Sequence, residues 1–289
     1  MISARNITAD FSQSDIYWFE RNFDSYAGRR FLESNWPLAF GTIALYISFV
    51  FAGPAYMKRR ERFEVRIPLI LWNVLLASFS IFGTFRTAPH FFRSLSTRGL
   101  HCIVCDNGFF QQPVVGFWCY MFTLSKLVEL GDTVFIVLRK QPLIFLHWYH
   151  HITVLLFCWH GNSEFSSTGQ FFGFMNFTVH SLMYTYYALK AARIKLPTVI
   201  AFFITSFQLS QMVVGIIGNC LAFSFKNAGL PCNISNLSLK LAFIMYFSYF
   251  VLFVNFFYRT YFKRGAKRSV VAKTEQVICQ AQILAKKAM

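Results

Sequence analysis

Three histidines fall within five residues in the stretch HWYHH, residues 147–151. His147 is one helical turn away from both His150 and His151, so a helix would direct the three rings from one face. Apolar residues surround the stretch. A single histidine in such surroundings would be a hydrogen-bonded core residue, whereas three on one helix face indicate a reactive or metal-binding site. Imidazole nitrogens either bind a metal ion or, as neutral nucleophiles, attack an acyl thioester. Other residues of the chain distinguish these two uses.

Polar side chains at helical spacing also interrupt three other apolar stretches: KLVELGDT (126–133), NFTVHSLMYTYY (176–187) and TSFQLSQ (205–211). The candidate residues in them are Lys126, Glu129, Asp132, Asn176, His180, Tyr184, Tyr187, Gln208 and Gln211. Lys126, Glu129 and Thr133 are expected to share one helix face, where the lysine and the glutamate can neutralise each other. Ionisable groups at membrane depth are functional candidates, and structural ion pairs or hydrogen bonds between helices are the alternative.

The elements that carry these residues are predicted to be membrane-spanning helices. The sequence is 55% hydrophobic and 19% aromatic, with a mean hydropathy of +0.43, which is too apolar for an ordinary soluble domain. Seven apolar stretches, each long enough to cross a hydrocarbon core of about 30 Å, begin near Trp36, Ile67, Pro113, Leu143, Phe171, Leu196 and Leu241. The sequence therefore predicts an all-α polytopic membrane protein. Residues 1–35 precede a seven-helix domain of residues 36–262, and a basic tail of residues 263–289 follows.

The distribution of charge predicts how these spans are oriented. The loops after spans one, three and five, together with the tail, hold 17 Lys and Arg residues, whereas the opposite loops and the N-terminal segment hold nine. By the positive-inside rule the 17 face the cytosol, so seven spans place the N-terminus in the lumen and the C-terminus in the cytosol. Lys286 and Lys287 resemble a cytosolic dilysine retrieval signal, and Asn6 lies in a lumenal glycosylation sequon. The expected location is the endoplasmic reticulum membrane.

The number and placement of the histidines count against a metal centre. His-x-x-His-His is also a histidine box of the membrane di-iron desaturases and hydroxylases, whose irons need about eight histidines, and this chain has seven. His90, His101 and His160 are predicted on the lumenal side, away from the cytosolic entry of the HWYHH helix. Neither a metal nor a cofactor is expected, and a single metal held by three histidines is the remaining alternative.

A histidine nucleophile agrees better with the surrounding residues. An acyl-imidazole is about as reactive as the thioester from which it forms, so it can hold an acyl group briefly. This chemistry needs a dry cavity for the acyl chain and cations for the phosphates of coenzyme A. The cations predicted at the cytosolic mouth are Arg139, Lys140, Lys190, Arg193 and Lys195. Bulky side chains one to three turns further toward the lumen would close the cavity, and the candidates are Phe157, Trp159, Phe172, Ile216 and Leu221.

The cysteines predict one covalent link on the lumenal side. Cys102, Cys105 and Cys232 all fall on that oxidising side. A disulfide from the loop that holds Cys102 and Cys105 to Cys232 would join span two or three to span six or seven.

Taken in order, KLVELGDT, HWYHH, NFTVHSLMYTYY and TSFQLSQ resemble the signature boxes of the very-long-chain fatty acid elongases, the ELO/ELOVL family. The resemblance extends from about Trp36 to Arg259, and FLHWYHHITVLL is most similar to the subgroup that acts on saturated and monounsaturated acyl-CoAs. It implies a 3-oxoacyl-CoA synthase of the endoplasmic reticulum, which condenses a fatty acyl-CoA with malonyl-CoA and releases CO2 and CoA. The implied fold has six helices in an inverted barrel around a narrow acyl tunnel, with the seventh helix outside.

The resemblance also implies roles and partners. His150 would be the nucleophile, His180 would lie across the tunnel, and His147 and His151 would complete the polar site. The implied disulfide is Cys105–Cys232. The implied partners are membrane lipid, the reductase, dehydratase and enoyl reductase of the elongation cycle, and homo- or hetero-oligomers of elongases, with no nucleic acid. The rival functions are a di-iron desaturase or hydroxylase and a seven-helix receptor or transporter.

Overall fold

The structure is a computed structural model that describes residues 15–263. Asn6, Lys286 and Lys287 lie outside these residues. Within residues 15–263 all regular secondary structure is helical, which confirms the predicted all-α class. The elements are α1 (Trp18–Arg21), α2 (Ser25–Ser34), α3 (Trp36–Met57), α4 (Arg66–Cys105), η2 (Gly108–Gln111), α5 (Pro113–Glu129), α6 (Asp132–Leu138), α7 (Phe145–Ser163), α8 (Gly169–Ala191), α9 (Thr198–Asn227), α10 (Asn236–Phe257) and the π-helical turn η3 (Tyr258–Lys263).

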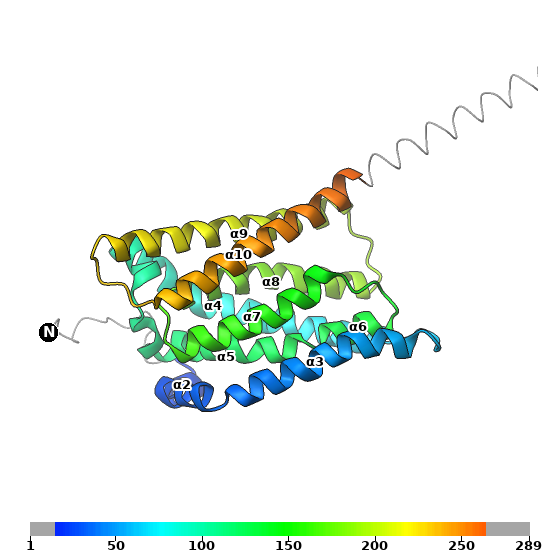
Figure 1. Cartoon of the computed structure of the whole chain (residues 1–289), viewed down its shortest axis with the longest axis horizontal. Helices are drawn as coiled ribbons and strands as arrows, with labels where there is room; N and C mark the ends of the chain where they lie inside the picture. The colour runs from blue at the N-terminus through cyan, green and yellow to red at the C-terminus, as the bar shows by residue number, and fades with distance from the viewer. Residues whose placement is uncertain (1–14, 264–289) are drawn as a thin grey trace, which may run out of the picture.

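The long helices lie side by side as a bundle (Figure 1). In this view α9 and α10 form one side, α3 forms the other, and α4, α5, α7 and α8 lie between them. One end of the bundle, at the right in Figure 1, carries the connections that follow α3, α6 and α8; we call it the basic end. The opposite end, at the left, carries α2, η2 and the α9–α10 connection; we call it the disulfide end.

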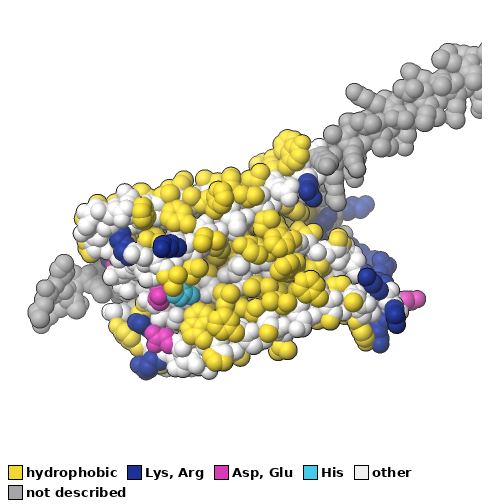
Figure 2. All heavy atoms as spheres, in the orientation of Figure 1, with side chains coloured by type: hydrophobic (Ala, Val, Ile, Leu, Met, Phe, Trp, Pro, Cys, Tyr) yellow, Lys and Arg dark blue, Asp and Glu magenta, His cyan; other side chains and the backbone are white. Residues whose placement is uncertain are grey.

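Four helices are long and apolar enough to span a membrane: Trp36–Met57, Arg66–Cys105, Thr198–Asn227 and Asn236–Phe262. The chain is therefore a multi-pass membrane protein, as the composition predicted. Hydrophobic side chains cover the length of the visible face, and Lys and Arg gather at the basic end, near the ends of α3 and α6 (Figure 2). The other three predicted spans fall on α5 with α6, on α7 and on α8. These segments hold the candidate site; α5 and α6 are individually short, with 17 and 7 residues, and polar side chains interrupt α7 and α8.

The stretch KLVELGDT does not form one continuous helix. Helix α5 ends at Glu129 and α6 begins at Asp132. At the break, a Cβ on Gly131 would lie 2.6 Å from the Trp72 indole, so only glycine lets α6 approach α4 this closely. Lys126, Glu129 and Thr133 are all buried, but they contact different helices. The first two meet side chains of α8, whereas Thr133 bonds residues of α3 and α7.

A disulfide joins Cys105, at the end of α4, to Cys232, in the α9–α10 connection. This is the pair that the family resemblance implies. Gly99, with φ of 73°, interrupts α4 ahead of it, and that left-handed backbone favours glycine. The bond therefore ties α4 to the α9–α10 connection at the disulfide end.

The interface between α4 and α8 depends on a small residue. A Cβ on Gly83 of α4 would lie 2.6 Å from the ring of Phe177, which follows Asn176 on α8. Glycine at helix crossings lets two backbones approach closely in a membrane. The position of the polar stripe on α8 thus depends on the absence of a side chain at residue 83.

We expect Gly83→Ala to lower the thermal stability of the detergent-solubilised protein by about 1–3 kcal/mol, because the added methyl displaces Phe177. The control is Gly41→Ala in α3, where no atom lies within 4 Å of the new Cβ. That change should leave the melting temperature unchanged or raise it slightly. Equal melting temperatures for the two variants would contradict the close contact.

Candidate active site

Two internal chambers meet at His150. The first, which we call the apolar chamber, has about 740 Å³ of empty space between α5, α7, α8 and α10. The second, which we call the polar chamber, has about 880 Å³ and lies toward the basic end, between α7, α8, α9 and α10. His150, Asn176, Gln211 and Met212 line both. A molecule that extends from one chamber into the other therefore passes the His150 ring.

The three histidines of HWYHH all line the polar chamber. His147 Nε2 lies 2.9 Å from the Thr133 hydroxyl, which in turn lies 2.7 Å from the hydroxyl of Tyr46 on α3. The ring centroids of His147 and His151 are 4.4 Å apart, and those of His150 and His151 are 5.5 Å apart. The Tyr46–Thr133 pair therefore holds His147 and leaves His150 as the histidine at the junction of the chambers.

A buried network crosses from α5 to α8 beside His150. Lys126 Nζ donates to Glu129 Oε1 at 2.7 Å and to Asn176 Oδ1 at 3.0 Å. Asn176 Nδ2 lies 3.3 Å from His180 Nε2, and His180 Nδ1 lies 3.9 Å from Glu129 Oε1. Lys126 and Glu129 are only 1% and 3% exposed, so each side chain is buried with a partner of opposite charge.

Asp132 joins three helices at the other side of the polar chamber. Its carboxylate accepts hydrogen bonds from Trp72 Nε1 at 2.6 Å and from the Tyr184 hydroxyl at 2.8 Å. Tyr184 is buried, whereas Tyr187, one turn further along α8, is exposed at the basic end. The polar stripe of α8 therefore runs from the junction of the chambers to the surface.

A third cavity, which we call the vestibule, opens at the basic end between α4, α6 and α8. It shares Asp132, His147, Tyr184 and Tyr187 with the polar chamber. Of the five predicted mouth cations, Arg139 and Lys190 line the vestibule. Lys140 instead donates to the Arg60 carbonyl oxygen at 2.8 Å, in the α3–α4 connection.

The two glutamines of α9 differ in their positions. Gln211 is buried and lines both chambers, whereas Gln208 lines only the polar chamber and donates to the sulfur of Met183 at 3.2 Å. Gln211 is thus the α9 glutamine at the junction of the two chambers.

Several residues of the site were not found from the sequence. Tyr249 of α10 donates to the backbone carbonyl of His150 at 3.2 Å and lies 2.6 Å from the Thr153 hydroxyl. Trp72 and Tyr46 bind Asp132 and Thr133 from α4 and α3. All three aromatic residues lie in strongly apolar stretches where no polar periodicity marks them. Only the tertiary structure shows that their polar atoms face the site.

Of the five residues predicted to close the acyl cavity, Phe157 and Phe172 line the apolar chamber. Trp159 instead points to α2, where its indole donates to the Leu32 carbonyl oxygen at 2.9 Å. Ile216 and Leu221 pack outside the chamber lining, in separate clusters. Positions around a helix could not be assigned from an apolar sequence, because nearly every side of these helices is hydrophobic.

The remaining histidines lie away from HWYHH. His90 is buried in α4 near Ser94, and His160 lies 3.0 Å from the Ser238 hydroxyl at the end of α7. Within residues 15–263, no group of three or more His, Cys, Asp or Glu side chains is placed to hold one metal ion.

Neutralisation of one member of the Lys126–Glu129 pair should destabilise the protein. Lys126→Met leaves a carboxylate at a buried position without its cation, so we expect a loss of about 3–5 kcal/mol. Adding Glu129→Gln removes the unpaired charge, and the double variant should be more stable than Lys126→Met alone. Thermal unfolding of the two single variants and the double variant gives the coupling, and simple additivity would contradict a direct ion pair.

Comparisons with known proteins show the family of this chain. Residues 31–269 match the family described as ELO: GNS1/SUR4 family. The chain is 48% identical to very long chain fatty acid elongase 6 of Drosophila melanogaster, over 91% of this chain and 84% of that protein. It is 45% identical to very long chain fatty acid elongase 6 of Homo sapiens, over 87% and 94%, and 44% identical to very long chain fatty acid elongase 3 of Mus musculus, over 83% and 88%. The chain belongs to the ELO family of fatty acid elongases.

Proposed function

We propose that this protein is the condensing enzyme of fatty acid elongation, a 3-oxoacyl-CoA synthase. It joins a saturated or monounsaturated acyl-CoA to malonyl-CoA and releases CO2 and CoA. The observation that carries the proposal is the position of His150, at the junction of the apolar and polar chambers. The elongase relatives support the same activity.

The chambers suggest how an acyl-CoA binds. The acyl tail occupies the apolar chamber, whose lining includes Phe122, Val154, Phe157, Phe172 and Met245. The thioester then lies at His150, and the coenzyme extends toward the basic end. Arg139 and Lys190 of the vestibule supply positive charge for its phosphates.

In the first half-reaction a ring nitrogen of His150 attacks the thioester carbonyl, and the C–S bond breaks. CoA leaves as a thiol after taking the proton that the imidazole ring loses, and the acyl group stays on His150. In the second half-reaction malonyl-CoA loses CO2 to give an enolate. Its carbon attacks the acyl-imidazole, the new C–C bond forms and the C–N bond to the imidazole breaks. The released imidazolate takes a proton from water, which returns His150 to its neutral state.

Amide groups beside His150 stabilise the developing oxyanion. Asn176 and Gln211 line both chambers at the His150 ring, so their NH2 groups are available to a carbonyl oxygen at the junction. Lys126 holds Asn176 by its Oδ1 atom, which leaves the NH2 group directed toward His180. His180, His147 and His151 complete the polar wall against which malonyl-CoA reacts.

The proposed function extends to the membrane arrangement. Seven spans are formed by α3, α4, α5 with α6, α7, α8, α9 and α10, and six of them enclose the tunnel as an inverted barrel. The basic end faces the cytosol, because it carries the excess of Lys and Arg, and the disulfide end faces the oxidising lumen of the endoplasmic reticulum. The reductase, dehydratase and enoyl reductase of the cycle take up the product, and the elongase associates with itself or with other elongases.

Incubation with acyl-CoA alone should trap the first intermediate. With neither malonyl-CoA nor any other acceptor present, the intact-protein mass should rise by one acyl group, and His150→Ala should remain unmodified and lose condensation by at least about 10³-fold. His160→Ala, near the end of α7 and outside both chambers, is the matched control. Full turnover without any mass increase would instead mean that a histidine acts only as a general base.

The orientation can be tested in sealed microsomes. A tag at the C-terminus should be accessible to added protease, and Asn6, if it carries a glycan, should be protected. Cleavage of tags at both termini from the same side would contradict an odd number of spans.

A further inference from the structure

Gly161 lines the apolar chamber and follows His150 by three turns of α7, which is about 16 Å at about 1.5 Å per residue. A fully extended chain advances about 1.25 Å per carbon, so about 13 carbons reach Gly161. The residues that close the apolar chamber beside Gly161 therefore limit the length of the acyl chain that fits.

The closing wall comes from two connections rather than from the sides of the long helices. Phe110 of η2 lines the chamber, as do Ser166 and Thr168 of the α7–α8 turn and Gly169 at the start of α8. Phe110 is 3% exposed and stacks on Phe165 with ring centroids 4.4 Å apart. A Cβ on Gly169 would lie 3.4 Å from the Phe110 ring, so the two segments are in contact. We call Phe110 and residues 166–169 the loop cap.

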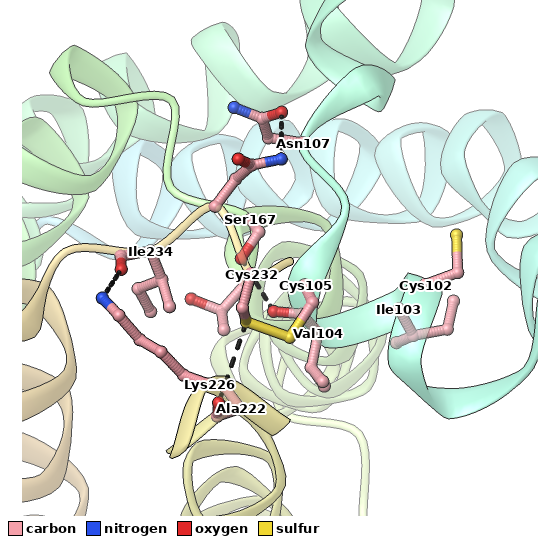
Figure 3. The surroundings of a disulfide bond; sticks show 12 residues. Cys102, Ile103, Val104, Cys105, Asn107, Ser167, Ala222, Lys226, Cys232 and Ile234 are labelled. Atoms are coloured by element: carbon pink, nitrogen blue, oxygen red, sulfur yellow. Dashed lines mark hydrogen bonds between the residues drawn. A yellow bond between two sulfur atoms is a disulfide. The ribbon is translucent and has the colours of Figure 1, made fainter. Parts of the chain in front are cut away.

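The loop cap is bound directly to the residues around the disulfide (Figure 3). Ser167, which is fully buried, donates through its hydroxyl to the Val104 carbonyl oxygen at 2.7 Å and through its backbone N–H to the Asn233 carbonyl oxygen at 3.0 Å. The Asn233 N–H in turn donates to the Cys105 carbonyl oxygen at 2.9 Å. Val104 and Asn233 are the immediate neighbours of the two bonded cysteines.

A second set of hydrogen bonds holds the Phe165 side of the cap. Asn107 Nδ2 donates to the Phe165 carbonyl oxygen at 3.1 Å, and Asn233 Nδ2 donates to Asn107 Oδ1 at 3.0 Å. The α4–α5 connection, the α7–α8 turn and the α9–α10 connection thus form one linked layer. The Cys105–Cys232 bond is the covalent member of that layer.

We propose that the loop cap sets the longest acyl chain that the enzyme elongates, and that the Cys105–Cys232 disulfide keeps the cap closed. This inference rests on the proposed function, because it assigns the apolar chamber to the acyl tail. The proposal differs from a chain-length limit set by side chains of the long helices. Phe157 and Phe172 belong to those helices, and in this proposal they form side walls that the acyl chain passes.

Two substitutions should shift the length preference in opposite directions. Phe110→Ala removes the end wall, so the longest accepted acyl chain should grow by about two to four carbons. For acyl-CoAs beyond the parental limit, kcat/KM of the variant relative to the parental protein should rise about fourfold for each added methylene. Gly161→Met fills the end of the chamber, where only Ser166 lies within 4 Å of a new Cβ, and should shorten the limit. Phe109→Ala is the matched control, because Phe109 is equally buried in the same cluster but does not line the chamber.

The measurement is incorporation of labelled malonyl-CoA by each purified full-length variant, with saturated acyl-CoAs of 10 to about 22 carbons. An unchanged length profile in Gly161→Met, or in a folded Phe110→Ala variant, would contradict the proposed role of the loop cap. Continued condensation of short acyl-CoAs by the same variants would leave the proposed function intact. Absence of incorporation by the parental protein at every length would instead refute the proposed function.

The contribution of the disulfide is tested separately. Combined Cys105→Ser and Cys232→Ser should extend or broaden the length profile in the same direction as Phe110→Ala, and Cys102→Ser, at a free buried cysteine of the same segment, should not. Ser167→Ala keeps the disulfide but removes the bond to Val104, and should give a smaller shift of the same sign. A parental profile in both Ser167→Ala and the folded double variant would show that the cap does not depend on this layer.

Discussion

Charge neutralisation inside a hydrocarbon layer is the constraint on which the site depends. Lys126 and Glu129 are both almost fully buried, and an isolated charge at that depth would be strongly unfavourable. Their pairing on α5 places an ammonium group where it also binds Asn176, and a carboxylate oxygen near His180. The pair therefore fixes α8 against α5 and orients the Asn176 amide, whose NH2 group is directed toward His180. The requirement to bury charge and the requirement to orient catalytic groups are met by the same two residues.

The break at Gly131 separates two tasks that a continuous helix would combine. Residues before it face α8 and the reaction site, whereas Thr133 faces α3 and α7 and bonds His147. Asp132, at the break itself, bonds α4 and α8 through Trp72 and Tyr184. A stretch of eight residues thus contacts four other helices.

The sequence was sufficient to predict the helical class and the polar residues of the four motifs, because polar side chains stand out in an apolar chain. His150, Asn176, His180 and Gln211 were all identified by type and spacing, and all four line the polar chamber in the structure. The sequence could not place Tyr249 or Trp159, because an aromatic residue in an apolar helix looks the same whether it faces a chamber, another helix or lipid. The course of α5 and α6 was also missed, since it depends on the contact between Gly131 and Trp72.

The closed end of the apolar chamber shows why a membrane enzyme can limit its substrate with connections rather than with spans. Side chains on the long helices form the walls of the chamber, and they must accept any acyl chain that reaches His150, the proposed nucleophile. The connections at the disulfide end lie beyond the helices and can vary without disturbing the buried ion pair. Their backbone groups must nevertheless be satisfied where they meet the chamber, and Ser167, Asn107 and Asn233 supply those partners. Chemistry and chain length are therefore determined at opposite ends of α7, which leaves each free to change without the other.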